Sequence, residues 1–449
     1  MSLATEQPTS IQTKTQLSGH KAREYICPGI ETLLILYGLW RMLNSFPILY
    51  FFDGIMRLNA MRELLHGEVS PTSYSLVGPL FSLPLWLTQG RHIASWWIPD
   101  KYNVFLFMLF MLAVYVAFRK RIDHSLLRKF FLVLIVASMF SDQVKYYGGE
   151  TFTATFVGFG ALAITLAPAW VGWATIVLGV VNTPATLIGL VCLSLKKIWD
   201  DKRWRCSLAV VAAGSLILAE SWIRRGNPLK SGYEGQVFDT PFIIGLLSII
   251  FAFNKGLLFF TPGLFLPIKK YILALEQEEE EKEKLYSAYM LWVSFVVGLI
   301  LIYSAWWAWD GALFWGPRFF LIACIPASFA LAVRLHKPSK SIVANLLTLV
   351  ALVWSLCVGI DGAIFDLNDL GQFCVVGNYQ NSRLCQYDPY HSPLWRPVVN
   401  HPALSHNDKV FIAYSLIVFA YLVVPLVITV TQEVYSIALR GWQAKIWRF

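Results

Sequence analysis

Long apolar runs separated by basic clusters are the feature that most restricts how this chain can fold. The first run covers about residues 30–52, and about 20 apolar residues suffice to span the hydrocarbon core of a bilayer. Apolar residues make up 56% of the 449 positions and charged residues only 14%, against about 25% in a soluble domain. The polar surface is too small for a water-soluble globule of this size. We therefore predict an all-α polytopic membrane protein.

The basic clusters predict the topology, because Lys and Arg gather in the cytoplasmic loops of membrane proteins. With every cluster in the cytoplasm, the parity of crossings gives about 12 transmembrane helices and two cytoplasmic termini. The net charge of +9 then reflects membrane orientation and does not indicate nucleic-acid binding. The predicted spans are 30–52, 103–118, 130–140, 151–167, 171–181, 183–195, 208–222, 257–268, 288–307, 319–333, 342–360 and 410–430.

The predicted organisation is one transmembrane domain over 26–432, between a cytoplasmic N-terminal tail (1–25) and a basic cytoplasmic tail (433–449). Its main outer loops cover 51–102 and 361–408. Within the first, residues 74–87 are amphipathic and rich in Pro and Gly, which predicts an interfacial helical segment. Cys374 and Cys385 share the second loop. Their positions are compatible both with a disulfide between them and with two free thiols. The acidic run from Glu278 to Glu281 predicts a solvated helix face.

With this topology, ionisable residues collect on the outer face, where charges near a bilayer are costly unless they are paired, hydrated or functional. The basic members of this group depart from the rule that Lys and Arg gather in cytoplasmic loops. An anionic ligand such as a lipid phosphate is one reason to keep them, since Arg offers two parallel donors to it. The group comprises Asp53, Arg57, Arg62, Glu63, Asp142, Lys145, Glu150, Arg224, Arg225, Lys230, Glu234, Asp239, Lys255, Asp310 and Arg318.

Three of these residues have a second interpretation. Asp53 directly follows the first span, where a carboxylate can deprotonate a hydroxyl, but it also suits an N-cap for residues 55–65. Lys255 could bind an anion, or it could anchor the chain at the interface, with its methylene groups along apolar surface and its ammonium in water. Arg318 follows Gly316 and Pro317 at the start of a span. That position fits an interfacial anchor equally well as an anion site at a helix N-terminus.

Five short segments carry a family resemblance through their order along the chain. The first segment, D-G-x-x-R, begins at Asp53, and the second, Y-x-L-x-x-P-L, begins at Tyr74. The third, G-x-P-x-x-x-G-Y, has Asn227 directly before its Pro and ends at Tyr233. A G-K-G-L turn surrounds Lys255, with Asn254 in place of its first Gly. W-x-W-x-G-x-x-x-W-G-P-R-F then contains Trp309, Asp310, Trp315 and Arg318. Over about residues 30–335 this order resembles the GT-C superfamily of membrane glycosyltransferases. Within it, the resemblance is to the bacterial branch that is similar to protein mannosyltransferases and lipid A aminoarabinose transferases.

The resemblance implies a GT-C-like fold that transfers a sugar from a polyprenyl-phosphate-linked donor to an acceptor hydroxyl, with inversion, at the outer face of the membrane. It implies that Asp53 is the general base, and Asp142 and Glu150 compete for the role of second acidic residue. The first candidates for binding the donor phosphate are Lys255 and Arg318, and the next candidates are Arg57, Lys145 and Arg225. The implied substrate-binding residues are Tyr74, Tyr233, Trp309, Asp310 and Trp315.

The implied partners are the polyprenyl-phosphate sugar, a lipid or glycan acceptor and membrane lipids, in the bacterial plasma (inner) membrane. No metal ligands are predicted and no cofactor is obligatory, because Lys and Arg can neutralise the phosphate, although a divalent metal stays an option. Two alternatives are a lipid-glycan transporter or flippase and a catalytically inactive GT-C-like scaffold. A transporter would favour midplane charges and pseudo-symmetric halves. Arg41 lies deep in a predicted span, and no matching halves are visible.

Overall fold

The computed structural model is built from helices, and it describes residues 11–47, 49, 52–88, 101–230, 232–233, 235–311, 314–365 and 386–446. No strand occurs among these residues, which confirms the all-α prediction. Within them, five helical segments are long and apolar enough to cross a membrane. They are Trp204–Arg225, Glu279–Ser304, Arg318–His336, Ile342–Ile364 and His406–Arg440. The total of about 12 spans stays a prediction.

Most predicted spans correspond to a helix with similar bounds. The clearest cases are α6 (Tyr102–Phe118), α9 (Glu150–Leu166), α10 (Ala169–Asn182), α12 (Leu208–Arg225) and α18 (Ile342–Ile364). The helices α1 (Ile11–Ser45), α16 (Glu279–Ser304) and α21 (His406–Ile446) extend beyond their predicted apolar runs. Three further helices each overlap a predicted span, namely α7 (His124–Val136), α11 (Leu187–Asp201) and α17 (Cys324–His336).

The predicted span over 257–268 is not a single helix. It divides into α14 (Leu257–Phe260) and the 3₁₀ turn η3 (Pro262–Phe265), and α15 (Lys269–Leu273) follows. Pro262 lacks a backbone N–H and disrupts a continuing helix, and Pro267 lies just beyond. The preceding helix α13 (Phe242–Phe251) was not predicted, because ten residues are too few for a straight span.

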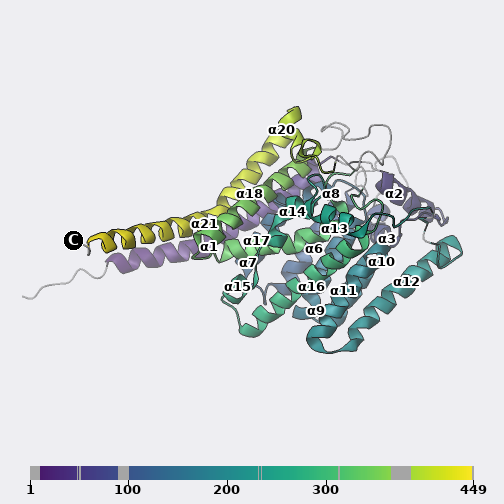
Figure 1. Cartoon of the computed structure of the whole chain (residues 1–449), viewed down its shortest axis with the longest axis horizontal. Helices are drawn as coiled ribbons and strands as arrows, with labels where there is room; N and C mark the ends of the chain where they lie inside the picture. Colours follow the sequence, from purple (N-terminus) through teal and green to yellow (C-terminus); the bar gives the residue numbers. More distant parts are fainter. Residues whose placement is uncertain are drawn as a thin grey trace, which may run out of the picture.

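Two long helices, α1 and α21, run antiparallel and extend to one side of the molecule (Figure 1). Phe46 packs edge-on against Phe411, and Tyr414 donates to the Leu34 carbonyl at 2.8 Å. Glu31, buried in α1, accepts from Tyr421 of α21 at 2.9 Å and pairs with Arg128 of α7 at 2.5 Å. This carboxylate therefore links three helices.

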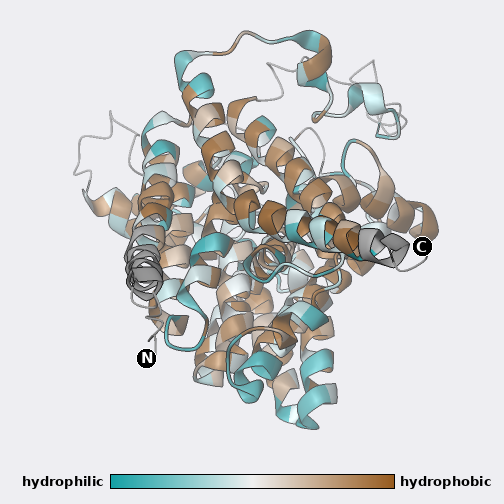
Figure 2. Cartoon of the chain, turned by 90° about the vertical axis from the view of Figure 1, so that its left-hand side faces the viewer, coloured by the Kyte–Doolittle hydropathy of each residue, from teal (hydrophilic) through white to brown (hydrophobic). Residues whose placement is uncertain are grey.

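The buried core lies where α7, α9, α16 and α17 meet. Phe130 packs edge-on against Phe329, and the indole of Trp292 donates to the Gly158 carbonyl at 2.9 Å. Hydrophobic residues occupy much of the helical bundle (Figure 2), and many of them on α12, α18 and α21 have exposed side chains. Exposed apolar surface of this extent indicates contact with lipid.

Polar loops gather at two opposite ends of this bundle. At one end, Asp123 before α7 lies 3.9 Å from His336 of α17, and Lys337 pairs with Glu276 at 2.5 Å. Three of the predicted cytoplasmic basic clusters, at 119–129, 269–270 and 334–340, include or closely adjoin these residues in the sequence. The other end holds the first turns of α2 (Phe52–Leu65) and α9, together with η4 (Arg318–Ala323). The short helices α3 (Val77–Phe81) and α4 (Leu83–Thr88) occupy the stretch predicted as interfacial.

Candidate functional site

Asp53 lies in the first turn of α2, where the partial positive charge of the helix end favours a carboxylate. Because α2 already begins at Phe52, Asp53 is not the N-cap of a helix that starts at residue 55. Its Oδ1 accepts from the Tyr74 hydroxyl at 2.6 Å, and its Oδ2 pairs with Arg318 Nη1 at 2.5 Å. Burial and the neighbouring carboxylate both raise the pKa of Tyr74, so its hydroxyl remains a donor.

Arg318 bridges two carboxylates from different helices. Its Nη1 lies 2.5 Å from Asp53 Oδ2 and 3.2 Å from Oε1 of Glu150, the first residue of α9. Its Nε donates to the Gly311 carbonyl at 3.1 Å, and its guanidinium carbon lies 3.5 Å from the centre of the Phe314 ring. The Arg318 side chain is 8% exposed and both carboxylates are 15% exposed. Several elements therefore hold this cluster in one geometry.

Lys255 holds the turn that presents Arg318. Its Nζ donates to the Phe314 carbonyl and, at 3.1 Å, to the Gly316 carbonyl. Gly311 and Gly316 have φ of +76° and +63°, a left-handed conformation that favours glycine. Burial lowers the pKa of Lys255 to about 8, although the Asp310 carboxylate acts in the opposite direction. The ammonium of Lys255 is thus directed at backbone carbonyls, and it lines neither of the two cavities described below.

The predicted substrate-binding residues Trp309, Asp310 and Trp315 are buried around the same turn. Trp315 is fully buried and donates from Nε1 to Asp361 Oδ2 at 2.9 Å. Asp310 accepts from Gln386 Nε2 at 2.9 Å. None of the three lines either cavity, so their visible contacts are internal to the protein.

The two competing acidic residues lie in different surroundings. Glu150 shares Arg318 with Asp53, whereas Asp142 of α8 (Phe140–Gln143) is buried and lies 3.4 Å from Lys145 Nζ. Lys145 also donates to the Phe365 carbonyl at 3.2 Å. Burial raises the pKa of Asp142 to about 6, against the opposing effect of Lys145. Glu150, and not Asp142, therefore contacts Arg318, the cation that pairs with Asp53.

Arg57, one turn along α2 from Asp53, connects the loop before α3 to the end of α10. Its Nη1 donates to the Ser75 carbonyl at 3.1 Å and to Asn182 Oδ1 at 3.4 Å. Its guanidinium carbon lies 5.1 Å from the centre of the Tyr74 ring. A side chain at Gly149 would collide with this guanidinium, since a Cβ there would lie 2.5 Å from Nη2.

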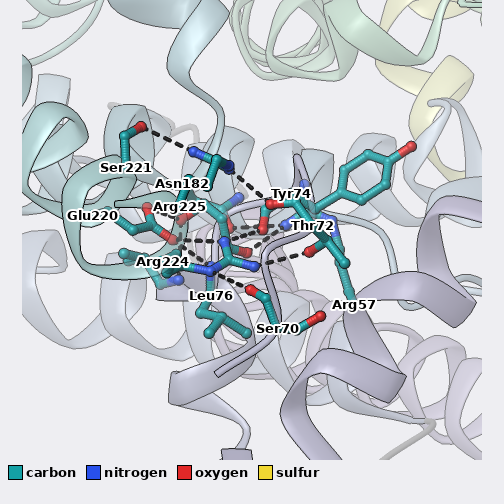
Figure 3. A network of polar contacts seen from close by, with 12 residues as sticks. Arg57, Ser70, Thr72, Tyr74, Leu76, Asn182, Glu220, Ser221, Arg224 and Arg225 are labelled. Atoms are coloured by element: carbon teal, nitrogen blue, oxygen red, sulfur yellow. Dashed lines mark hydrogen bonds and ion pairs between the residues drawn. The ribbon is translucent and has the colours of Figure 1, made fainter. Parts of the chain in front are cut away.

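A cleft of about 600 Å³ opens beside Tyr74. Figure 3 shows Arg224 and Arg225 reaching from the end of α12 to the loop that carries Ser70, Thr72 and Tyr74. Arg224 donates to the Ser70 carbonyl at 3.0 Å and to Thr72 Oγ1 at 2.8 Å, and Arg225 donates to the Thr72 carbonyl at 2.8 Å. The lining includes Thr72, Tyr74, Arg224, Arg225, Lys230 and Tyr233.

A second cavity of about 10 Å³, with room for about one water molecule, lies beside Arg318. Glu150 and Arg318 line it together with Thr153 of α9 and Tyr303 of α16. Asp53 lines neither cavity, but it contacts Tyr74, which lines the large cleft, and Arg318, which lines the small cavity. In the part of the chain that the structure describes, no three His, Cys, Asp or Glu side chains are grouped to hold a metal ion.

Sequence reasoning missed Glu220 and Asn182 as parts of this region. Glu220 accepts from Ser75 Oγ and from the Leu76 backbone N–H, each at 2.8 Å, and pairs with Arg224 at 3.1 Å. A lone acidic residue inside the predicted span 208–222 was the available signal. Its partners Ser75 and Leu76 lie about 145 residues away, which no local pattern indicates.

The comparisons with known proteins agree with this fold. No family model and no curated protein sequence matches the chain. Two crystal structures of ArnT from Cupriavidus metallidurans, a lipid A aminoarabinose transferase of the GT-C type, do match. The form bound to undecaprenyl phosphate has a TM-score of 0.50 at 12% identity, covering 92% of this chain and 78% of that one. The apo form has a TM-score of 0.51 at 12% identity, with 90% and 76% covered. The chain therefore has the helical fold of ArnT, which confirms the GT-C-like fold implied by the sequence motifs.

Proposed function

We propose that the chain is a membrane glycosyltransferase. It moves a sugar from a polyprenyl-phosphate-linked donor to a hydroxyl of a lipid or glycan acceptor, with inversion, at the outer face of the membrane. The observation that carries this proposal is the Asp53 carboxylate, which is held between Arg318 and Tyr74, a residue that lines the large cleft. This group lies at the end of the bundle opposite the basic loops, as an outer-face site requires.

The reaction needs a base for the acceptor and a cation for the leaving group. Asp53 takes the proton of the acceptor hydroxyl as its oxygen bonds to the anomeric carbon. The bond from that carbon to the phosphate oxygen breaks, and the phosphate leaves with the electron pair. Arg318 neutralises the phosphate, and a cation that is positioned in advance in a buried site stabilises such charge effectively. Glu150 orients Arg318 for this role.

The remaining candidates divide into contact and positioning roles. Tyr74, Tyr233 and Arg225 line the cleft and contact substrate. Lys255 positions the turn before Arg318, because its ammonium bonds to the Phe314 and Gly316 carbonyls. Arg57 and Lys145 likewise donate to backbone carbonyls and shape the surroundings of α2 and α8. Trp309, Asp310 and Trp315 support the same turn from within the protein.

The choice of donor is supported by the fold and by the surface. The ArnT structure with the same fold was crystallised with undecaprenyl phosphate. In this chain, extensive apolar surface on α12, α18 and α21 suits a membrane in which such a lipid is dissolved.

The test is radiolabelled sugar transfer in membranes that contain the wild type, Asp53→Asn or Asp239→Asn at equal abundance, with a panel of polyprenyl-phosphate sugars. Asp239 is exposed and serves as a matched control. We expect Asp53→Asn to lose about 10²–10⁴-fold in rate and Asp239→Asn to retain activity. Full activity of Asp53→Asn would overturn the assigned base. No transfer by the wild type with any donor, together with no binding of undecaprenyl phosphate, would favour the inactive-scaffold interpretation.

A further inference from the structure

The large cleft has a strongly one-sided charge. Three cations, Arg224, Arg225 and Lys230, line it, and none of the described lining residues is acidic. Thr72, Ser73 and Tyr74 add hydroxyl groups to the same wall. Such a combination of cations and hydroxyls is suited to an oxyanion.

The three cations differ in how far contacts with other residues already use their charge and hydrogen-bond donors. Arg224 is buried, with hydrogen bonds to the loop at 70–74 and an ion pair with Glu220, so its charge is already balanced. Arg225 is half-buried; its Nη atoms bond to Ser221, Lys230 and Thr72, and its Nε has no partner. Lys230 is exposed. Its backbone N–H donates to the Asn227 carbonyl at 3.2 Å and its backbone carbonyl accepts from Arg225, so both hydrogen bonds involve its backbone and not its ammonium. Arg225 and Lys230 therefore present positive charge to the cleft, and no acidic residue among the described lining residues balances it.

The cleft and Arg318 lie on different sides of the base. Tyr74 joins Asp53 Oδ1 to the cleft wall, and Arg318 is bound to Oδ2. Inversion requires that the acceptor and the leaving phosphate meet the anomeric carbon from opposite faces. If Arg318 holds the donor phosphate, the acceptor approaches from the side of Tyr74.

We propose that this cleft is the acceptor site, and that the acceptor carries a phosphate or another oxyanion near its reacting hydroxyl. Arg225 and Lys230 bind the oxyanion, and Tyr74 places the hydroxyl next to Asp53. This inference rests on the proposed function, and it narrows the acceptor from any lipid or glycan to an anionic one.

The first experiment measures binding to the purified full chain in detergent by titration calorimetry. The probes are N-acetylglucosamine 1-phosphate and uncharged N-acetylglucosamine, and the variants are Lys230→Gln and Lys409→Gln. Lys409 is exposed near the start of α21 and does not line the cleft. We expect saturable binding of the phosphate-bearing sugar only, weakened about tenfold in Lys230→Gln, which is the loss of one charge-assisted contact. Lys409→Gln should bind like the wild type.

Two results would overturn the oxyanion site: equal binding by Lys230→Gln and Lys409→Gln, or equal affinity for the uncharged sugar. Arg225→Gln should weaken binding further, but it also removes the hydrogen bond to Thr72, so the exposed Lys230 carries the test.

A second arm separates the acceptor from the donor. Undecaprenyl phosphate should bind to Lys230→Gln as to the wild type and bind more weakly to Arg318→Gln. The reverse pattern would make the cleft the donor-phosphate site and overturn the acceptor assignment. Failure of the wild type to bind undecaprenyl phosphate, with Lys230-dependent binding of the sugar phosphate retained, would instead count against the proposed glycosyltransferase and leave the oxyanion site in place.

Discussion

At the scale of single residues, the site depends on one guanidinium shared by two carboxylates. Arg318 contacts Asp53 and Glu150, bonds to Gly311 and stacks on Phe314. A planar fork with several fixed donors can make all of these contacts at once, whereas an ammonium cannot. The identity of the cation therefore matters as much as its charge.

We expect Arg318→Lys to reduce the rate of sugar transfer about 10- to 100-fold, because at least one charge-assisted hydrogen bond, worth roughly 2 kcal/mol, is lost. Single-turnover rates at saturating donor would measure this loss. Arg440→Lys, an exposed change on α21, is the control. A rate for Arg318→Lys within about twofold of wild type would contradict the assigned role.

Asp142 predicts a distinct dependence of stability on pH. Its pKa in the folded state is about 6, above the ordinary 3.8, because burial disfavours the charged form. Between these values the folded chain holds a proton that the unfolded chain has released, so the contribution of Asp142 to stability falls as the pH rises through about 6. We expect the midpoint of thermal unfolding to fall less in Asp142→Asn than in wild type between about pH 4 and pH 7. Parallel curves would show that Asp142 does not titrate in this window.

At the scale of elements, hydropathy predicted the helices whose apolar run is bounded by polar or charged residues. Residues 103–118 and 151–167 were predicted within one residue of α6 and α9. The run at 257–268 failed because hydropathy counts apolar side chains and ignores the missing N–H of Pro262. Residues 242–251 were missed because the method looks for full-length spans.

The site was predictable to the extent that its residues lie in short motifs. Asp53, Tyr74 and Arg318 come from three motifs, and the structure brings them into contact. The partners of Lys255 and Trp315 were not predictable, because backbone carbonyls and Asp361 are brought near them by tertiary folding. The same holds for Glu220, whose partners belong to a different segment.

Packing between α9 and α10 depends on close backbone approach at glycine. A Cβ at Gly172 would lie 2.5 Å from the Ile164 backbone nitrogen, whereas a Cβ at Gly214 of α12 would have open space around it. Small residues allow membrane helices to approach in this way. We expect Gly172→Val to destabilise the fold by about 1–3 kcal/mol, and Gly214→Val to have little effect. Unfolding in a denaturing detergent would compare the two, and equal loss would contradict this account of α9 and α10.

At the scale of the whole molecule, the two polar ends predict opposite sides of a membrane. Leu229 is exposed beside the cleft, and Lys340 is exposed at the end with the basic loops. In a chain whose seven Cys have been replaced, we expect Leu229→Cys to react with an impermeant maleimide in intact spheroplasts. Lys340→Cys should react only after permeabilisation. The opposite labelling would place the site on the cytoplasmic side and refute an outer-face reaction.

The helix α13 connects the cleft to the lipid phase. Its side chains Phe242, Ile243, Ile244, Leu247 and Phe251 are all exposed, and the helix begins six residues after Gln236, which lines the cleft. A bilayer that covers these side chains brings its surface to the mouth of the cleft. A lipid-borne acceptor would then arrive at the cleft by lateral diffusion in two dimensions, and the rate of transfer would depend on its mole fraction in the bilayer. Dilution of such an acceptor with inert phospholipid, at constant bulk concentration, should therefore slow transfer in proportion.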